Sequence, residues 1–284
     1  MKVQEVFHAL EDFAPLALQD SFDNAGLQIG LTGDVDATGV LLCLDVTEDV
    51  VAEAAQRGCN VVVSHHPLLF HPLKSITDAD YVGRTVMSAI RHGIALYAAH
   101  TNLDNAPGGV NHKIAERLGL AGLSWLQPKA GMDAGSGLVG VLPQAVEAER
   151  FIDRVVAEFQ VPCARFNAWN GRMVQRVAVC GGAGAFLIPQ AIQAGADAFV
   201  TGEIGYHRFF GHETDLLLME IGHYESEQYT LEILHDIISR ACPELRIVYT
   251  ELRTNPIITS PNPSQGPPLI PPRGEDAIRK EMGK

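Results

Sequence analysis

Val61-Val62-Val63-Ser64-His65-His66-Pro67 joins a short apolar run to two adjacent histidines and a proline. A run of this length and composition suits a buried strand better than a helix. Pro67 then stops the strand, because proline has no backbone N–H to donate to a sheet. The stretch therefore predicts a buried strand that delivers two histidines at its end.

Two further apolar runs end in potential metal ligands. Residues 95–99 are followed by His100 and, four positions later, by Asp104, and residues 216–219 are followed by His223 and Glu227. Open α/β sheets bind their ligands at the carboxyl ends of the strands. The three clusters together predict a site for two metal ions.

A weak internal repeat indicates the architecture. A strand at 40–45, a helix at 47–57 and a strand at 61–63 are echoed by a strand at 177–181, a helix at 188–193 and a strand at 198–203. Such units prefer parallel strands and right-handed crossovers, which bring strand ends to one side of a sheet. We therefore expect an α/β fold of two related, interlocked halves with the metal site between them.

The turn-rich residues 127–137 mark the boundary between the halves. We expect a first half over residues 1–126 with the His-His and His/Asp ligands, and a second half over 127–258 with the His-x-x-x-Glu ligands. Residues 259–284 are rich in proline and end in charges, a composition typical of a flexible tail.

Composition narrows the classes of function. The 284 residues are 46% hydrophobic with a net charge of −13, and no Lys/Arg run offers a phosphate-binding stripe, so nucleic acid is not expected as a partner. Arg165, Arg172 and Arg176 are more readily explained as solvated charges than as a basic patch.

The five cysteines form no Cys-x-x-Cys pair, which fits a reducing cytoplasm. No apolar stretch approaches the ~18 residues of a membrane span and no signal-peptide core is present, so we expect a cytoplasmic protein without membrane contact.

Spacing suggests how each ligand is presented. His223 and Glu227 are four residues apart, so a helix beginning near residue 225 would point both toward one place; alternatively, Glu227 only favours the helix N-terminus. His65 and His66 would splay to opposite sides of an extended backbone, each toward a different ion, unless they are ordinary surface histidines.

Asp104 and Glu227 add hard carboxylates to the imidazoles. Such a mixed set suits Zn, Fe, Mn, Co or Ni rather than Ca, although Asp104 also fits an Asx-type turn. His100 is a further ligand, a residue that orients one, or a general base. Residues 181–184, GGAG, suit a tight turn better than a phosphate loop, and no G-x-S-x-G elbow is present, so activated water is the better nucleophile.

These motifs resemble the Nif3-like family, also called GTP cyclohydrolase 1 type 2 homologs. The resemblance covers residues 1–258 and rests on residues 23–30, 64–70, 99–104, 181–184, 201–207 and 222–227. It implies that His65 and Asp104 hold one metal ion, that His66 and His223 hold a second, and that Glu227 bridges both. It also implies a toroidal homohexamer.

The expected function is that of a dinuclear-metal hydrolase which uses metal-activated water on a small nucleotide-like or cyclic-amide substrate, with His100 and Glu203 as proton carriers. Two divalent transition-metal ions per chain would be its cofactors. The alternative is a non-catalytic protein for metal handling or regulation, because metal ligands alone do not establish turnover.

Overall fold

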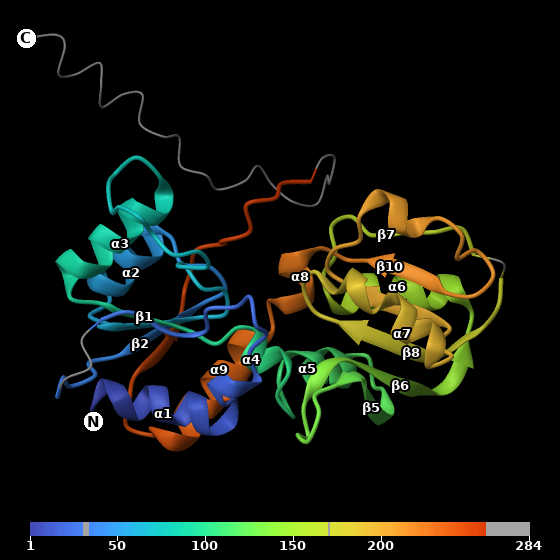
Figure 1. Cartoon of the computed structure of the whole chain (residues 1–284), viewed down its shortest axis with the longest axis horizontal. Coiled ribbons are helices and arrows are strands. Elements are labelled where there is room, and N and C mark those ends of the chain that lie inside the picture. Colours follow the sequence, from blue (N-terminus) through green and yellow to red (C-terminus); the bar gives the residue numbers. More distant parts are fainter. Residues whose placement is uncertain (31–33, 170, 260–284) are drawn as a thin grey trace, which may run out of the picture. The chain divides into compact units, whose positions relative to one another are not determined.

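The computed structural model describes residues 1–30, 34–169 and 171–259. The predicted tail, apart from Thr259, lies outside the described residues. Met1–Thr254 form one compact unit, and a second begins at Asn255. Both sheets and all candidate ligands belong to the first unit (Figure 1).

The first sheet has five strands in the order β1 (Gly26–Ile29), β4 (Ala95–Ala98), β3 (Val61–Ser64), β2 (Val40–Cys43) and β11 (Ile247–Tyr249). The last four are parallel, and β1 runs antiparallel to β4. The strands predicted at residues 61–63 and 95–99 are confirmed. All residues of β2, β3 and β4 are buried, which explains their continuous apolar sequences.

The second sheet has six strands in the order β5 (Ala121–Pro128), β6 (Gly135–Val146), β8 (Val174–Cys180), β9 (Ala198–Thr201), β10 (Leu217–Glu220) and β7 (Arg165–Phe166). β8, β9 and β10 are parallel. The turn-rich residues after Pro128 connect β5 to its antiparallel neighbour β6. The division predicted between residues 126 and 127 thus falls inside β5.

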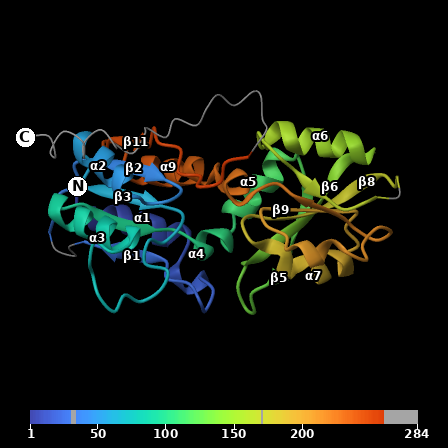
Figure 2. The same ribbon diagram turned by 90° about the horizontal axis from the view of Figure 1, so that it is seen from above.

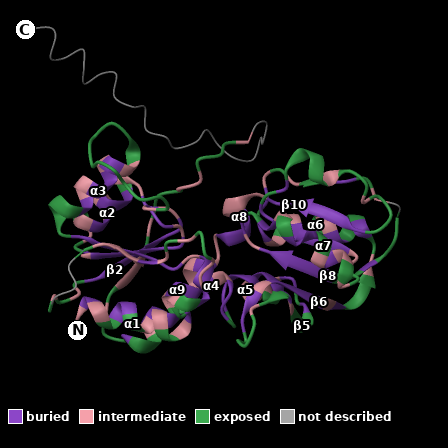
Figure 3. Ribbon diagram, viewed as in Figure 1, coloured by how far each residue is buried: buried purple, intermediate pink, exposed green. Residues whose placement is uncertain are grey.

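Helices cover both faces of each sheet. On the first sheet, α2 (Glu48–Gln56) and α3 (Tyr81–His92) pack on one face, and α1 (Val3–Phe13) and α9 (Thr230–Ala241) pack on the other. On the second sheet, α7 (Ile188–Gln193) and α6 (Ala148–Glu158) lie on opposite faces (Figure 2). α5 (Val110–Arg117) contacts β6 and β8. Figure 3 shows the strands largely buried, with exposed residues gathered on the outer helices and loops.

Short helical segments complete the fold: η1 (Leu16–Leu18), α4 (Thr101–Asp104), η2 (Gly184–Leu187), η3 (Tyr206–Phe209) and α8 (His223–Glu227). The local sequence sets several helix ends. The Thr47 hydroxyl accepts a hydrogen bond from Val50 N at the start of α2, and Asp80 does the same for Gly83 N at the start of α3. α3 ends at Gly93, whose φ of 63° suits glycine.

The chain crosses back to the first sheet near its end. After β10 it forms α8 and α9, and β11 then pairs in parallel with β2, with Ile247 opposite Val40. Leu234 and Ile238 of α9 are fully buried in the core that this helix shares with α1. The predicted α/β fold of two related, interlocked halves is confirmed.

Candidate metal centre

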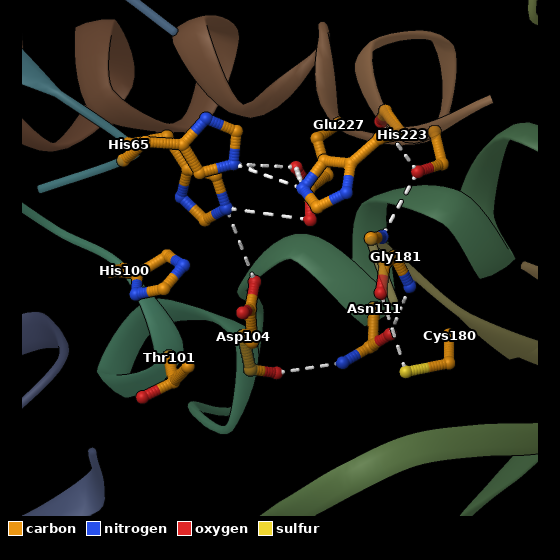
Figure 4. Close-up of polar contacts among 12 residues, drawn as sticks. His65, His100, Thr101, Asp104, Asn111, Cys180, Gly181, His223 and Glu227 are labelled. Carbon is orange, nitrogen blue, oxygen red and sulfur yellow. Dashed lines mark hydrogen bonds and ion pairs between the residues drawn. The ribbon is translucent and has the colours of Figure 1, made fainter. Parts of the chain in front are cut away.

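Three segments that follow parallel strands converge on one cluster. His65 and His66 come directly after β3, Asp104 ends α4 after β4, and His223 and Glu227 begin and end α8 after β10. Figure 4 shows side chains from these segments facing one another. The potential ligand atoms fall into three groups, each within 4.8 Å: His65, His66 and His100; His66, His223 and Glu227; and His65, Asp104 and Glu227. The structure therefore brings together all five predicted metal ligands and His100.

Glu227 lies at the centre of this cluster. Its Oε2 is 3.0 Å from His66 Nε2 and 3.1 Å from His223 Nε2, and its Oε1 is 3.6 Å from His65 Nε2. His65 Nε2 is also 3.6 Å from Asp104 Oδ1. One carboxylate thus faces imidazoles that follow strands of both sheets.

Each of the four histidines in the cluster donates a hydrogen bond from its Nδ1 atom, which fixes the orientation of its ring. The acceptors are Ala99 O for His65 at 2.8 Å, Asp45 Oδ1 for His66 at 2.7 Å, Asp23 Oδ1 for His100 at 2.6 Å and Glu203 Oε1 for His223 at 2.7 Å. Because these oxygens accept, Nδ1 carries a proton in each ring, and the neutral form of each imidazole has its lone pair on Nε2. Metal-binding histidines are oriented in this way.

Two of these anchoring carboxylates, Asp45 and Asp23, were not predicted from the sequence. Asp45 is the last residue of the strand predicted at 40–45, two residues beyond the end of β2, and Asp23 belongs to residues 23–30, which carry part of the family resemblance. The signal available in the sequence was a carboxylate beside a strand end, the pattern already used for Asp104. Glu203, predicted as a proton carrier, contacts His223 Nδ1, and its proton-carrying role stays a prediction.

Two buried atoms test whether a metal ion fits. His65 Nε2 and Asp104 Oδ1 are buried and have no hydrogen-bond partner among the described residues. A buried lone pair and a buried carboxylate oxygen without a donor are both unfavourable. A divalent cation would satisfy both atoms at once, so the donor set fits a metal ion.

The electrostatics of the carboxylates agree with this. Burial, reinforced by the charge of Glu227, raises the pKa of Asp104 well above its usual value. Burial acts in the same direction on Glu227, but the imidazoles of His65 and His223 outweigh it and hold its pKa well below the usual range. Two carboxylates at such close range need more positive charge to be ionised together.

The histidines divide into two kinds. Burial lowers the pKa of His65, which keeps that ring neutral. Burial also opposes the charged forms of His66 and His223, but contacts with Asp45 and Glu227 raise the pKa of His66 to about 10, and Glu227 and Glu203 raise that of His223 to about 9. In the absence of a cation these two rings hold protons that a metal ion must displace.

Three local expectations need correction or refinement. His65 and His66 do not splay to opposite sides: β3 ends at Ser64, the backbone bends, and the two rings lie 4.9 Å apart beside the same cluster. α8 begins at His223, just before residue 225, near which the helix start was expected. Asp104 ends a helical turn with its Oδ1 in the cluster, so it is not explained by an Asx-type turn.

The glycine-rich turn at residues 181–184 supports the cluster, and the N–H groups of its three glycines all donate to side chains of the protein. Gly181 N donates to Asn111 Oδ1, Gly182 N to Ser226 Oγ and Gly184 N to Thr201 Oγ1. Gly182 has a φ of 60°, and a Cβ there would collide with Glu227 Oε1. The turn thus requires glycine where it approaches Glu227.

Cys180 lies close to this cluster but is a poor candidate ligand. Its side chain is buried, and burial raises the pKa of the thiol. Metal binding needs the thiolate form, which this setting disfavours. The nitrogen and oxygen donors therefore define the site.

Comparison with known proteins agrees with the fold. Residues 1–256 match the family described as Duf34/NIF3 (NGG1p interacting factor 3), and the chain belongs to this family. Among its relatives, the "GTP cyclohydrolase 1 type 2 homolog" of Clostridium acetobutylicum is 31% identical, over 92% of this chain and 96% of that protein. "NIF3-like protein 1" of Drosophila melanogaster is 30% identical, over 91% and 89%.

Solved structures show the same fold. Protein SA1388 of Staphylococcus aureus superposes with a TM-score of 0.83 at 28% identity, covering 91% of this chain and 99% of that one. Reduced HcgD from Methanocaldococcus jannaschii gives a TM-score of 0.76 at 26% identity, covering 89% and 98%. Within the described residues, no helix combines the length and apolar character needed to cross a membrane.

Proposed function

We propose that this protein is a metal-dependent hydrolase acting on a small nucleotide-like or cyclic-amide substrate. The observation that carries the proposal is that two buried atoms, His65 Nε2 and Asp104 Oδ1, have no hydrogen-bond partner among the described residues and lie in a cluster of imidazoles anchored at Nδ1. The name of several relatives, GTP cyclohydrolase 1 type 2 homolog, supports a nucleotide-like substrate.

In this proposal the cluster holds two divalent transition-metal ions. His65 and Asp104 would bind one, His66 and His223 the other, and Glu227 would bridge them. Bound ions of this kind polarise a substrate oxygen and lower the pKa of water. The mixed donor set suits Zn, Fe, Mn, Co or Ni.

In this proposal His100 carries the proton that the attacking water loses. Its Nδ1 is bound to Asp23, whose side chain is fully buried, and its ring packs edge-on against His65 at 5.3 Å. In hydrolysis of a cyclic amide, the water oxygen bonds to the carbonyl carbon while His100 Nε2 takes a proton from the water. The C–N bond then breaks and the ring nitrogen receives that proton. Asp23 would stabilise the intervening imidazolium, as carboxylates do in catalytic dyads.

The test is turnover by metal-loaded protein. Wild type and His100→Gln would be incubated with GTP, other purine nucleotides and cyclic amides, and products followed by chromatography. We expect hydrolysis by wild type and a loss of roughly 10²- to 10⁴-fold in the variant, with metal content unchanged. If metal-loaded wild type hydrolyses nothing in the panel, the enzymatic proposal fails.

A second candidate is a non-catalytic metal-handling protein. The observation that favours it is the exposure of two candidate ligands to solvent. The His223 and His66 side chains are 31% and 22% exposed, so ions bound there could exchange with solvent. Rapid transfer of bound metal to a competing chelator, without turnover of any substrate, would support this candidate. We also propose that the chain works in the cytoplasm, which its cysteine pattern fits, and that it forms a homohexamer, as the resemblance to the family suggests.

A further inference from the structure

Two exposed aromatic rings lie beside the metal centre. Phe22 is 65% exposed and Phe70 is 37% exposed, and their ring centroids are 6.3 Å apart. Phe70 in turn lies 6.1 Å from the His100 ring, in an edge-to-face arrangement. A continuous line of rings therefore runs from solvent, through Phe22 and Phe70, to the histidine cluster.

The backbone that carries these rings is firmly held. Asn24 Nδ2 donates to Leu69 O at 2.6 Å, and Gln28 Oε1 accepts from Leu69 N at 3.1 Å, so the segment after Phe22 is tied to the segment before Phe70. Asp23, next to Phe22, accepts from Thr101 N at 3.1 Å as well as from His100. The two phenylalanines are thus exposed apolar side chains on backbone segments that hydrogen bonds hold together.

Such an arrangement suits a flat ligand. A preformed apolar surface next to a few convergent polar groups is the usual composition of a small-molecule site. Phenyl rings attract planar π systems through stacking and edge-to-face contacts. Two side chains make a small surface, comparable in extent to one bound ring.

We propose that Phe22 and Phe70 determine specificity by stacking on a planar unsaturated ring of the substrate, whose oxygen donors reach the metal centre. The inference rests on the proposed function only in taking that centre as the place where the substrate's polar end binds. It adds the class of substrate: a heteroaromatic ring joined to an oxygen-rich group, rather than an aliphatic amide or a sugar phosphate alone.

The test compares two probes on metal-loaded, full-length protein by calorimetry. Guanosine 5′-monophosphate carries a planar ring, and ribose 5-phosphate offers the same sugar and phosphate without one. The variants are Phe22→Leu/Phe70→Leu, which keeps apolar bulk but removes the π faces, and Phe166→Leu, an equally apolar change at a 51% exposed residue on the edge strand β7.

We expect wild type and Phe166→Leu to bind guanosine 5′-monophosphate more tightly than ribose 5-phosphate. In the double variant the dissociation constant of the nucleotide should rise roughly 5- to 100-fold, while binding of ribose 5-phosphate and metal content stay unchanged. Equal binding of both probes by wild type, or unchanged nucleotide binding in the double variant, would overturn the inference. A changed sedimentation coefficient with unchanged nucleotide binding would instead assign the rings to contact with a second copy.

Because binding is measured without turnover, the two proposals can fail separately. If the nucleotide binds tightly, its binding depends on the two phenylalanines and no substrate is hydrolysed, the stacking role stands and the hydrolase proposal fails. Hydrolysis of a panel substrate by wild type, together with nucleotide binding that the double variant leaves unchanged, would keep the hydrolase and remove the stacking role.

Discussion

His66 Nε2 and Glu227 Oε2 lie 3.0 Å apart, although 161 residues separate them in the chain. One follows a strand of the first sheet and the other ends a helix that follows the second sheet. The candidate metal centre is thus built from residues far apart in the sequence. It can form only when the segments that follow the two sheets have come together.

The first prediction concerns Glu227→Gln. Glutamine keeps the size of the side chain but removes the negative charge that faces His66 and His223. We expect elemental analysis of untagged wild type to give about two transition-metal ions per chain, and the variant to lose both. Glu232→Gln, on α9 and paired with Lys113 and Arg117, is the control and should keep the metal. Less than one ion in reconstituted wild type would contradict the site.

Asp104→Asn should change stability in opposite directions with and without metal. Because the folded protein raises the pKa of Asp104, ionising it costs stability as the pH rises above the unfolded value of 3.8. At pH 7 the metal-free variant should therefore melt no lower than metal-free wild type. With metal present the order should reverse, because the variant loses a ligand.

Thermal melts with and without a chelator measure this crossover, and Asp153→Asn, at an exposed position on α6, is the matched control. A variant that is less stable in both states would show that Asp104 is a structural carboxylate.

Metal binding should release protons at pH 7. His66 and His223 have pKa values of about 10 and 9 without a cation, whereas a ligating imidazole must be neutral. Calorimetry in buffers of different ionisation enthalpy should give roughly two protons released per chain at saturation. The number should fall as the pH rises through 9 and 10. Absence of proton release at pH 7 would mean that these rings are not ligands.

Asp23→Asn should destabilise the protein and remove part of its acid sensitivity. Burial opposes ionisation, but His100 and Thr101 outweigh it and lower the pKa of Asp23 from 3.8 to about 2. A depressed pKa stabilises the fold above 3.8, and this contribution is lost as the pH falls toward 2.

The variant should therefore lose about 2 kcal/mol of unfolding free energy at pH 7 and little at pH 2. Urea titrations at several pH values test this, with the exposed Asp12→Asn as control. An equal loss at every pH would point to a steric effect instead.

Gly182→Ala offers a matched pair with Gly195→Ala. Both glycines have positive φ, 60° and 68°, so both alanines should cost about 1 kcal/mol of backbone strain. A Cβ at Gly182 would also collide with Glu227, whereas one at Gly195 meets no described atom within 4 Å. Only Gly182→Ala should lose metal by elemental analysis, and equal metal content in both variants would refute the role of the turn.

Much of the fold could be predicted from local patterns in the sequence. The apolar runs at residues 61–63 and 95–99 are strands because their neighbours bury them on both faces, and α7 matches the helix predicted at 188–193. The ligand residues followed from the same logic, since strand ends of parallel units gather at one edge.

The rest depends on contacts that a local pattern does not encode. Asp45 and Asp23 look like ordinary solvated carboxylates until the fold brings His66 and His100 to them. β11 has only three residues, and its place beside β2 is decided by pairing across about two hundred intervening positions. Short strands of this kind carry little information in their own sequence.

The position of β11 also has a consequence for synthesis of the protein. A ribosome makes the chain from its amino end, so β2 cannot pair with β11 until residue 249 has been translated. During this time α1 lacks its partner α9, and His65 and His66 lack the carboxylate of Glu227. A nascent chain halted before residue 227 therefore has an incomplete candidate metal centre, and any ion that needs Glu227 can bind only after that residue has been translated.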